Sequence, residues 1–263
     1  GLMLTAILGP YAGFLTMIGI LAVQCLLFAD GGLLALGCNV WNMAFYGCFV
    51  ASMFIFKPII QKHLSKKRIM IASILGSIVS LQLGALSVVI ETELSGITAL
   101  PWNLFLGVMQ PIHLAIGAVE GIITGLVLSF IYEARPELIW QGHTNKKAKT
   151  SKKSLLAIFG VAAVIVAGVL SLFASAFPDG LEWSILKLTG STELHSKGGV
   201  YALSSHIQKL TALLPDYMIP GQSSVVGGMI AGIIGVIVVI ALYMLIHYYH
   251  EKHSDSDQQS ASN

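Results

Sequence analysis

The sequence feature that most constrains the fold is the recurrence of apolar stretches about as long as a bilayer is thick. An α-helix needs about 20 predominantly apolar residues to cross the hydrocarbon core. Six such stretches occur, at residues 10–28, 33–56, 69–90, 111–132, 155–177 and 225–248. Lipid offers backbone groups no hydrogen-bond partner, so helices are the only economical structure at this length. The sequence therefore predicts an all-α fold, a polytopic bundle of about six transmembrane helices.

Composition and cysteine usage agree with a membrane protein. Only 11% of the residues are charged, whereas a soluble domain carries about 25%. Lipid must therefore cover much of the surface. The three cysteines, Cys25, Cys38 and Cys48, lie in apolar stretches without a CxxC spacing, which favours packing roles over a disulfide framework or a zinc site.

Basic residues gather in two places and predict how the chain is threaded. One cluster follows the second stretch and the other follows the fourth: Lys57, Lys62, Lys66, Lys67 and Arg68, then Arg135, Lys146, Lys147, Lys149, Lys152 and Lys153. Short basic loops stay on the cytoplasmic side. We therefore expect both clusters in the cytoplasm of a cell (inner) membrane, and the segments 29–32, 91–102 and 178–224 outside.

Shifts in composition divide the chain into four parts. Residues 1–140 hold four of the apolar stretches, and residues 141–153 form a basic, polar linker. Residues 154–250 hold the other two stretches. Residues 251–263 are polar and are expected to be a disordered cytoplasmic tail.

Common enzyme motifs are absent from the sequence. It contains no GxxxxGK[ST] loop for ATP, no HExxH and no GxSxG. Function must therefore come from polar groups inside the membrane domain or from partner proteins.

Ionisable groups at membrane depth are costly, so each is a candidate for function. The segment PIHLAIGAVEGIITG places His113 and Glu120 seven residues apart. Two helical turns put them on one face, roughly 10 Å apart along the axis. Pro111 suits the first turn of a helix, so residues 102–110 are expected to form a separate segment or a kink. We expect a polar site near the outer mouth; the alternative is a structural hydrogen bond between helices.

A second polar group occurs in the segment ADGGLLALGCNVWNMA. Asp30, Gly31 and Gly32 fit a tight turn between two membrane helices. Asn39 and Asn42 follow on one helix face. Asp30 and Asn39 are expected either to shape an outward pocket or to serve the turn, and Asn42 is expected to bond between helices.

Several of these segments resemble a known family. The runs GLMLTAILGPYAG, VQCLLFADGGLLALGCNVWNMAFYG and PIHLAIGAVEGIITG resemble the substrate-binding membrane component of cobalt and nickel energy-coupling-factor transporters, the CbiM/NikM type. This resemblance covers residues 1–137. The run AFPDGLEWSI, at residues 176–185, resembles the PDGLE domain, a two-span companion often fused behind that component.

The resemblance implies an importer component without enzymatic activity. It captures a divalent cobalt or nickel ion from outside, and the ion is cargo rather than a resident cofactor. A separate transmembrane coupling protein and ATP-binding-cassette ATPases drive its release inward, and no nucleic acid is involved. Two alternatives remain open. One is an accessory protein that binds no metal, and the other is an intramembrane enzyme using His113 and Glu120.

The resemblance also implies where the ion is held. In the family the main ligands are an opening Met-His and a further histidine just ahead of a GGxLxAILxGP stretch. This sequence starts at Gly1, so the primary ligands, and an odd number of membrane spans, are expected upstream. Asp30, Asn39, His113 and Glu120 are then candidates for groups that orient those ligands through hydrogen bonds.

Overall fold

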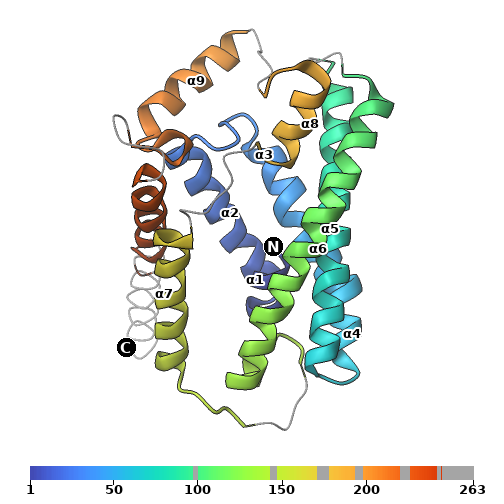
Figure 1. The fold of residues 1–263 in the computed structure, drawn as a ribbon, viewed down its shortest axis with the longest axis vertical. Coiled ribbons are helices and arrows are strands. Elements are labelled where there is room, and N and C mark those ends of the chain that lie inside the picture. Colours follow the sequence, from blue (N-terminus) through green and yellow to red (C-terminus); the bar gives the residue numbers. More distant parts are fainter. Residues whose placement is uncertain are drawn as a thin grey trace, which may run out of the picture.

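A computed structural model describes residues 1–96, 100–142, 147–170, 178–192, 198–219, 226–241 and 244. Throughout this part the regular structure is helical, without strands (Figure 1). The helices are α1 (Leu2–Leu8), α2 (Pro10–Phe28), α3 (Leu36–Asn39), the π-helix η1 (Val40–Phe56), α4 (Lys57–Gln61), α5 (Lys66–Ser95), α6 (Trp102–Ala134), the 3₁₀ helix η2 (Pro136–Leu138), α7 (Lys152–Gly168), α8 (Gly180–Thr189), α9 (Gly199–Thr211), the 3₁₀ helix η4 (Pro215–Tyr217) and an apolar helix at Val226–Ala241.

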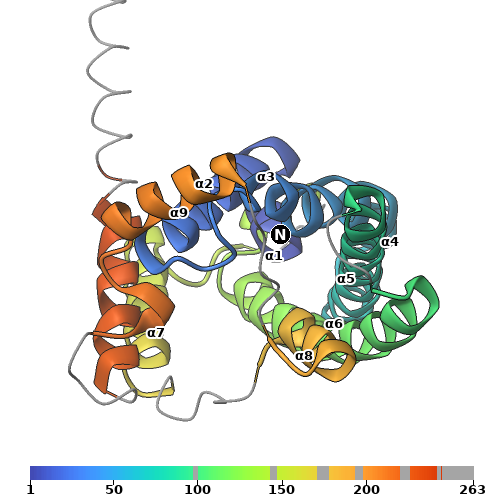
Figure 2. The ribbon, with the colours of Figure 1, turned by 90° about the horizontal axis from the view of Figure 1, so that it is seen from above.

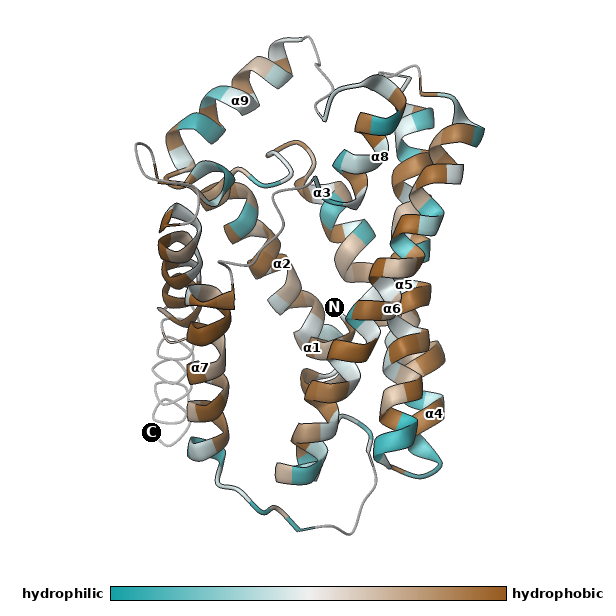
Figure 3. Cartoon of the chain, in the orientation of Figure 1, coloured by the Kyte–Doolittle hydropathy of each residue, from teal (hydrophilic) through white to brown (hydrophobic). Residues whose placement is uncertain are grey.

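Within the described ranges, four helices are long and apolar enough to cross a membrane. They are α2, the continuous helix Leu36–Gln61 made of α3, η1 and α4, then α5 and α6. Apolar residues dominate the middle of these helices and polar residues their ends (Figure 3). The all-α membrane fold is thus confirmed, with four of the six expected spans. The other two stretches are seen as shorter helices, α7 with 17 residues and Val226–Ala241. Their expected continuations, 171–177 and 245–248, lie outside the described residues.

The expected helix start at Pro111 is wrong, because α6 runs through this residue. A proline inside a helix leaves the carbonyl of the residue four before it, Gly107, without its usual partner. Membrane helices tolerate this where neighbouring groups supply hydrogen bonds. Next to Pro111, the side chains of Gln82 on α5 and Gln110 on α6 donate to each other's backbone carbonyls, at 2.8 and 3.3 Å, rather than to the Gly107 carbonyl. This reciprocal pair ties α6 to α5 beside the proline.

A stripe of glycines brings α6 close to α5. Gly117, Gly121 and Gly125 recur every four residues and are buried. A Cβ atom at Gly117 would lie 2.9 Å from the Cα of Ile78, and one at Gly121 would lie 2.5 Å from the Cα of Ile74. Small residues at this spacing allow such an approach in membranes, where packing rather than water drives association.

The two ends of the bundle differ in charge. The connection between α4 and α5 and the linker before α7 lie at one end, whereas the turn at residues 29–35, α8 and α9 lie at the other (Figure 1). The view along the bundle places α8 against α6 and α9 across α2 (Figure 2), and both pairs of helices are in contact. The described parts of both basic clusters therefore lie at one end of the bundle, and α8 and α9, from the segment 178–224, lie at the other.

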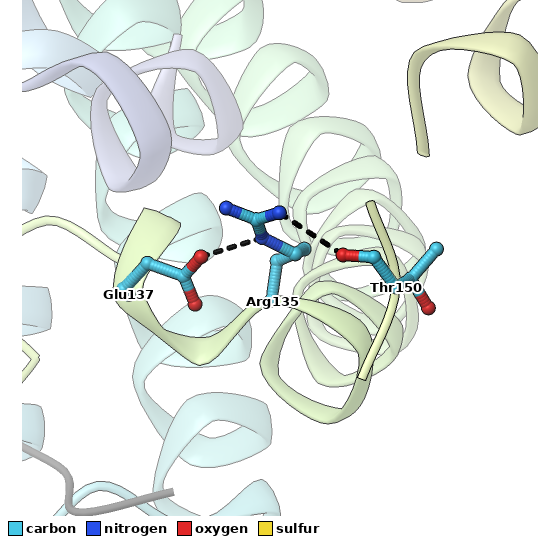
Figure 4. A network of polar contacts seen from close by, with 3 residues as sticks. All are labelled: Arg135, Glu137 and Thr150. Atoms are coloured by element: carbon cyan, nitrogen blue, oxygen red, sulfur yellow. Dashed lines mark hydrogen bonds and ion pairs between the residues drawn. The ribbon is translucent and has the colours of Figure 1, made fainter. Parts of the chain in front are cut away.

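The linker is fixed to the end of α6 by Arg135 (Figure 4). The Nε atom of Arg135 donates to Oε1 of Glu137 at 2.5 Å, and its Nη1 donates to the carbonyl of Thr150 at 3.0 Å. The backbone N–H groups of Lys149 and Thr150 donate to the carbonyl of Ala134. These bonds place the start of α7 next to the end of α6.

Candidate functional site at the end opposite the basic loops

The turn after α2 collects two of the candidate residues. Ala29, Gly31 and Gly32 all have positive φ values, of 60°, 78° and 73°, a conformation that glycine adopts without steric cost. The backbone therefore reverses within a few residues and leaves Asp30 at the surface. The side chain of Asn39 packs on the turn, because a Cβ atom at Gly31 would overlap its Nδ2 atom. Asp30 and Asn39 are thus neighbours.

Tyr217, which is 187 residues from Asp30 along the chain, forms a hydrogen bond with its carboxylate. The hydroxyl of Tyr217 donates to Oδ2 of Asp30 at 2.6 Å, and Nε2 of Gln24 donates to both groups at 3.4 Å. The ring of Tyr217 stacks on Phe28 with centroids 4.4 Å apart. Burial first, and then the hydrogen bond to the Asp30 carboxylate, raise the pKa of Tyr217 above its ordinary value. Sequence reasoning missed this residue, since nothing in its local pattern links it to the turn.

Helix α9 lies over the same turn. The Leu33 N–H donates to Oε1 of Gln208 at 3.3 Å, and the Leu214 N–H donates to the carbonyl of Leu27 at 3.0 Å. An open hollow of about 340 Å³ lies between the turn and α9, with Gly32 and Gln208 among its lining residues. The segment after α8 therefore covers the turn that carries Asp30.

Asn42 takes the interhelical role expected for it. Its Nδ2 donates to Oε2 of Glu91 on α5 at 2.9 Å. One turn further along, the hydroxyls of Tyr46 and Ser87 are 2.6 Å apart. Glu91 was not singled out from the sequence. Its place near the end of the third apolar stretch, opposite the start of the second, was the signal that could have found it.

His113 faces the first turn of α8. Its Nδ1 lies 2.8 Å from the carbonyl of Met109. A carbonyl only accepts, so Nδ1 carries a proton, and in the neutral imidazole Nε2 then has the free lone pair. A Cβ atom at Gly180 would lie 3.0 Å from Cε1 of His113 and 3.2 Å from its Nε2. The imidazole therefore packs directly on Gly180, within the segment that resembles the PDGLE motif.

Glu120 lies deeper on α6 and is half-buried. Among the described residues its side chain forms no hydrogen bond or ion pair, so the structure pairs it with neither His113 nor Asn39. Nor does the described part bring three or more His, Cys, Asp or Glu side chains together as a metal site. Of the four candidates, Asp30 and Asn39 share the turn after α2, whereas His113 lies on α6 against α8.

Two protein families match consecutive parts of the chain. Residues 1–138 match the family described as the cobalt uptake substrate-specific transmembrane region, CbiM. Residues 153–252 match the PDGLE domain. No solved structure matches the chain.

Curated relatives match either most of this chain or about half of it. The chain is 35% identical over 244 residues to a protein of Archaeoglobus fulgidus named "Putative fused nickel transport protein NikMN", covering 92% of this chain and 74% of the relative. It is 26% identical to the fused nickel transport protein NikMN of Rhodobacter capsulatus, over 89% of this chain and 74% of the relative. It is 34% identical to the cobalt transport protein CbiM of Acetoanaerobium sticklandii, over 51% of this chain and 55% of the relative. The chain therefore belongs to the CbiM family of cobalt and nickel uptake transmembrane proteins, a transporter family rather than an enzyme family, and carries a fused PDGLE domain.

Proposed function

We propose that the protein is the substrate-binding membrane component of an ATP-driven cobalt or nickel importer of the energy-coupling-factor type. The family match over residues 1–138 carries this proposal. The protein captures the divalent ion from outside and passes it inward. The partners are a transmembrane coupling protein and a pair of ATP-binding-cassette ATPases, because the sequence has no P-loop of its own.

The distribution of charge supports an orientation. Short basic loops are retained in the cytoplasm, so the end with the α4–α5 connection and the linker faces inward. The turn with Asp30 and Asn39, together with α8 and α9, then faces outward in a multi-pass cell membrane protein. We also propose that the capture domain spans residues 1–140, the linker 141–153 and the PDGLE domain 154–250.

We propose that the four polar candidate residues orient the metal ligands and do not by themselves form the metal site. Nitrogen-rich, near-planar ligation favours Ni²⁺, and Co²⁺ is close to it in affinity. Such a site needs several nitrogen ligands, whereas His113 is the one histidine among the four. We therefore propose that Asp30, Asn39, His113 and Glu120 orient metal ligands that other residues supply.

Ion uptake in cells tests the proposal. The gene that encodes this chain is expressed with its coupling protein and ATPases in a host that lacks nickel and cobalt uptake, and radioactive Ni²⁺ and Co²⁺ are measured. ATP-dependent accumulation of either ion, lost when this gene is omitted, is expected. If uptake persists without the protein, or if the purified protein binds neither ion while it modulates uptake by another component, the accessory role replaces the proposal.

A further inference from the structure

The PDGLE domain places one short helix, α8, against the capture domain. The apolar side chains of α8 recur on one face, at Leu181, Ile185 and Leu188. They pack into a cluster with Phe105 and Met109 of α6 and with residues of α5. Helix α8 therefore fills an apolar surface at the end of the bundle opposite the basic loops.

The first turn of α8 is built by the residues of the DGLE segment themselves. The carboxylate of Asp179 accepts a hydrogen bond from the Glu182 N–H at 2.8 Å, and the carboxylate of Glu182 accepts one from the Asp179 N–H at 3.3 Å. This capping box satisfies two backbone donors that would otherwise lack partners at the helix start. Asp179 and Glu182 therefore fix where α8 begins and how its first turn is shaped.

Gly180 lies between Asp179 and Glu182, at a close approach to α6 of the capture domain. A Cβ atom there would lie 2.9 Å from Cδ1 of Ile116 and 3.0 Å from Cε1 of His113. The 2.9 Å separation is shorter than real Cβ atoms show, so the Ile116 and His113 side chains would have to shift to admit even a methyl group. A bulkier residue such as valine would strain the contact between α8 and α6 further. The absence of a side chain at Gly180 thus leaves room for the imidazole ring of His113. The hydrogen bond from Nδ1 of His113 to the Met109 carbonyl fixes the orientation of this ring.

We infer that the DGLE segment is a docking element whose receptor is His113 on α6, and that docked α8 shields the Nε2 atom of that histidine. Each residue then has its own part. Asp179 and Glu182 shape the turn, Gly180 admits the imidazole, and Leu181 begins the apolar face that fills the surface beside it. The inference concerns how the two domains are joined, so it stands or falls independently of ion import.

Chemical modification of histidines tests the docking directly. Diethyl pyrocarbonate reacts with the free nitrogen of a neutral imidazole, and mass spectrometry gives a rate for each site in the purified full chain. His206 is exposed on α9 and serves as the internal reference. In the unaltered protein we expect His113 to react several-fold more slowly than His206.

Two variants loosen the docking in different ways. Gly180→Val adds bulk where the His113 imidazole packs. Asp179→Ala removes the hydrogen bond that caps α8 without adding bulk. Both should speed the modification of His113, Asp179→Ala by about fivefold, the usual effect of losing an N-cap. Neither should change the rate at His206. The control is Gly107→Ala on α6, where a Cβ atom meets nothing within 4 Å, and it should leave both rates unchanged.

The rates at the two histidines and the two buried thiols together decide whether α8 docks on His113. Equal rates at His113 and His206 in the unaltered protein would overturn the inference, as would an unchanged His113 rate in both loosened variants. A variant that simply misfolds would raise the reactivity of buried Cys25 and Cys48 toward a maleimide. A rate increase confined to His113, with both thiols still protected, supports the docking. Ion uptake enters none of these readouts, so a failure of the proposed function would be seen separately.

Discussion

The Nδ2 atom of Asn42 lies 2.9 Å from Oε2 of Glu91, so a hydrogen bond to a carboxylate joins η1 to α5 in the half of the bundle opposite the basic loops. Asn42 is 7% exposed, and Glu91 is only partly exposed. A buried or half-buried carboxylate that loses its donor keeps its desolvation cost. This hydrogen bond gives the first prediction.

Asn42→Ala should lower the free energy of unfolding by about 1–3 kcal/mol, because Glu91 would lose this donor. Asn42→Asp should cost more, since it sets two carboxylates against each other. The thermal midpoint of the purified protein in detergent measures both effects. Glu93→Ala is the matched control, because Glu93 is exposed and lies on the same helix. If Asn42→Ala had the same thermal midpoint as this control, the hydrogen bond would not contribute to stability.

Gly121→Ala should disrupt the contact between α5 and α6. The added Cβ would lie 2.5 Å from the Cα of Ile74 and 3.0 Å from the carbonyl of Ser73, and backbone atoms cannot move aside as a side chain can. We expect a loss of about 1–3 kcal/mol or more. Gly107→Ala in the same helix meets open space and should be neutral or stabilising by about 0.5–1 kcal/mol. Membrane abundance and thermal midpoints compare the two variants.

The contact between Tyr217 and Asp30 should depend on pH. The pKa of Tyr217 is raised in the folded protein by burial and by the Asp30 carboxylate. A group with a raised folded pKa contributes stability below its unfolded pKa, about 10 for tyrosine, and that contribution is lost as pH rises through the folded value. Tyr217→Phe should therefore be less stable than the unaltered protein at neutral pH, and the gap should narrow in strong alkali.

Asp30→Asn provides a separate check on the same contact. Removing the negative charge should lower the pKa of Tyr217 toward its ordinary value, because the charge opposes ionisation of the phenol. Ultraviolet absorbance of the phenolate, compared with Tyr217→Phe as a blank, measures this shift. An unchanged titration in Asp30→Asn would show that burial alone raises the pKa.

Cysteine labelling should place the two ends of the bundle on opposite sides of the membrane. After Cys25, Cys38 and Cys48 are replaced by alanine, new cysteines are introduced one at a time. An impermeant maleimide on intact cells should label Leu213→Cys, which is 71% exposed beside α9. It should spare Lys62→Cys, in the basic connection before α5, until the membrane is opened. The reverse pattern would contradict the proposed orientation.

Glu120→Gln should weaken ion uptake by about 10–100-fold if the carboxylate orients a ligand, the usual effect of removing such a support. Membrane abundance should stay normal, since Glu120 makes no helix-to-helix bond within the described residues. Loss of the folded protein would instead assign Glu120 a structural role. Glu93→Gln, on an exposed surface, should alter neither quantity.

The sequence by itself determined the fold class, the bounds of α2 and the family. Apolar length forces helices in lipid, and α2 begins and ends at the residues expected, Pro10 and Phe28. The turn at Asp30, Gly31 and Gly32 also followed from the local sequence, because its backbone needs positive φ values that glycine adopts easily. Pro111 misled because α6 continues through it, in a helix that packs along α5 and is joined to it beside the proline by the Gln82–Gln110 pair. The preference of proline for a helix start does not reveal such a tertiary contact.

The tertiary structure alone decided which polar groups meet. Tyr217 is 187 residues from Asp30, and Gly180 is 67 from His113 along the chain. Such pairs depend on where α8 and η4 pack on the bundle. The apolar face of α8 packs in a cluster with α6, whereas Tyr217 of η4 packs against Phe28 of α2 and Leu214. Periodicity specifies one helix at a time, because it reports which face is apolar. The partner of that face is chosen only when all the helices pack together.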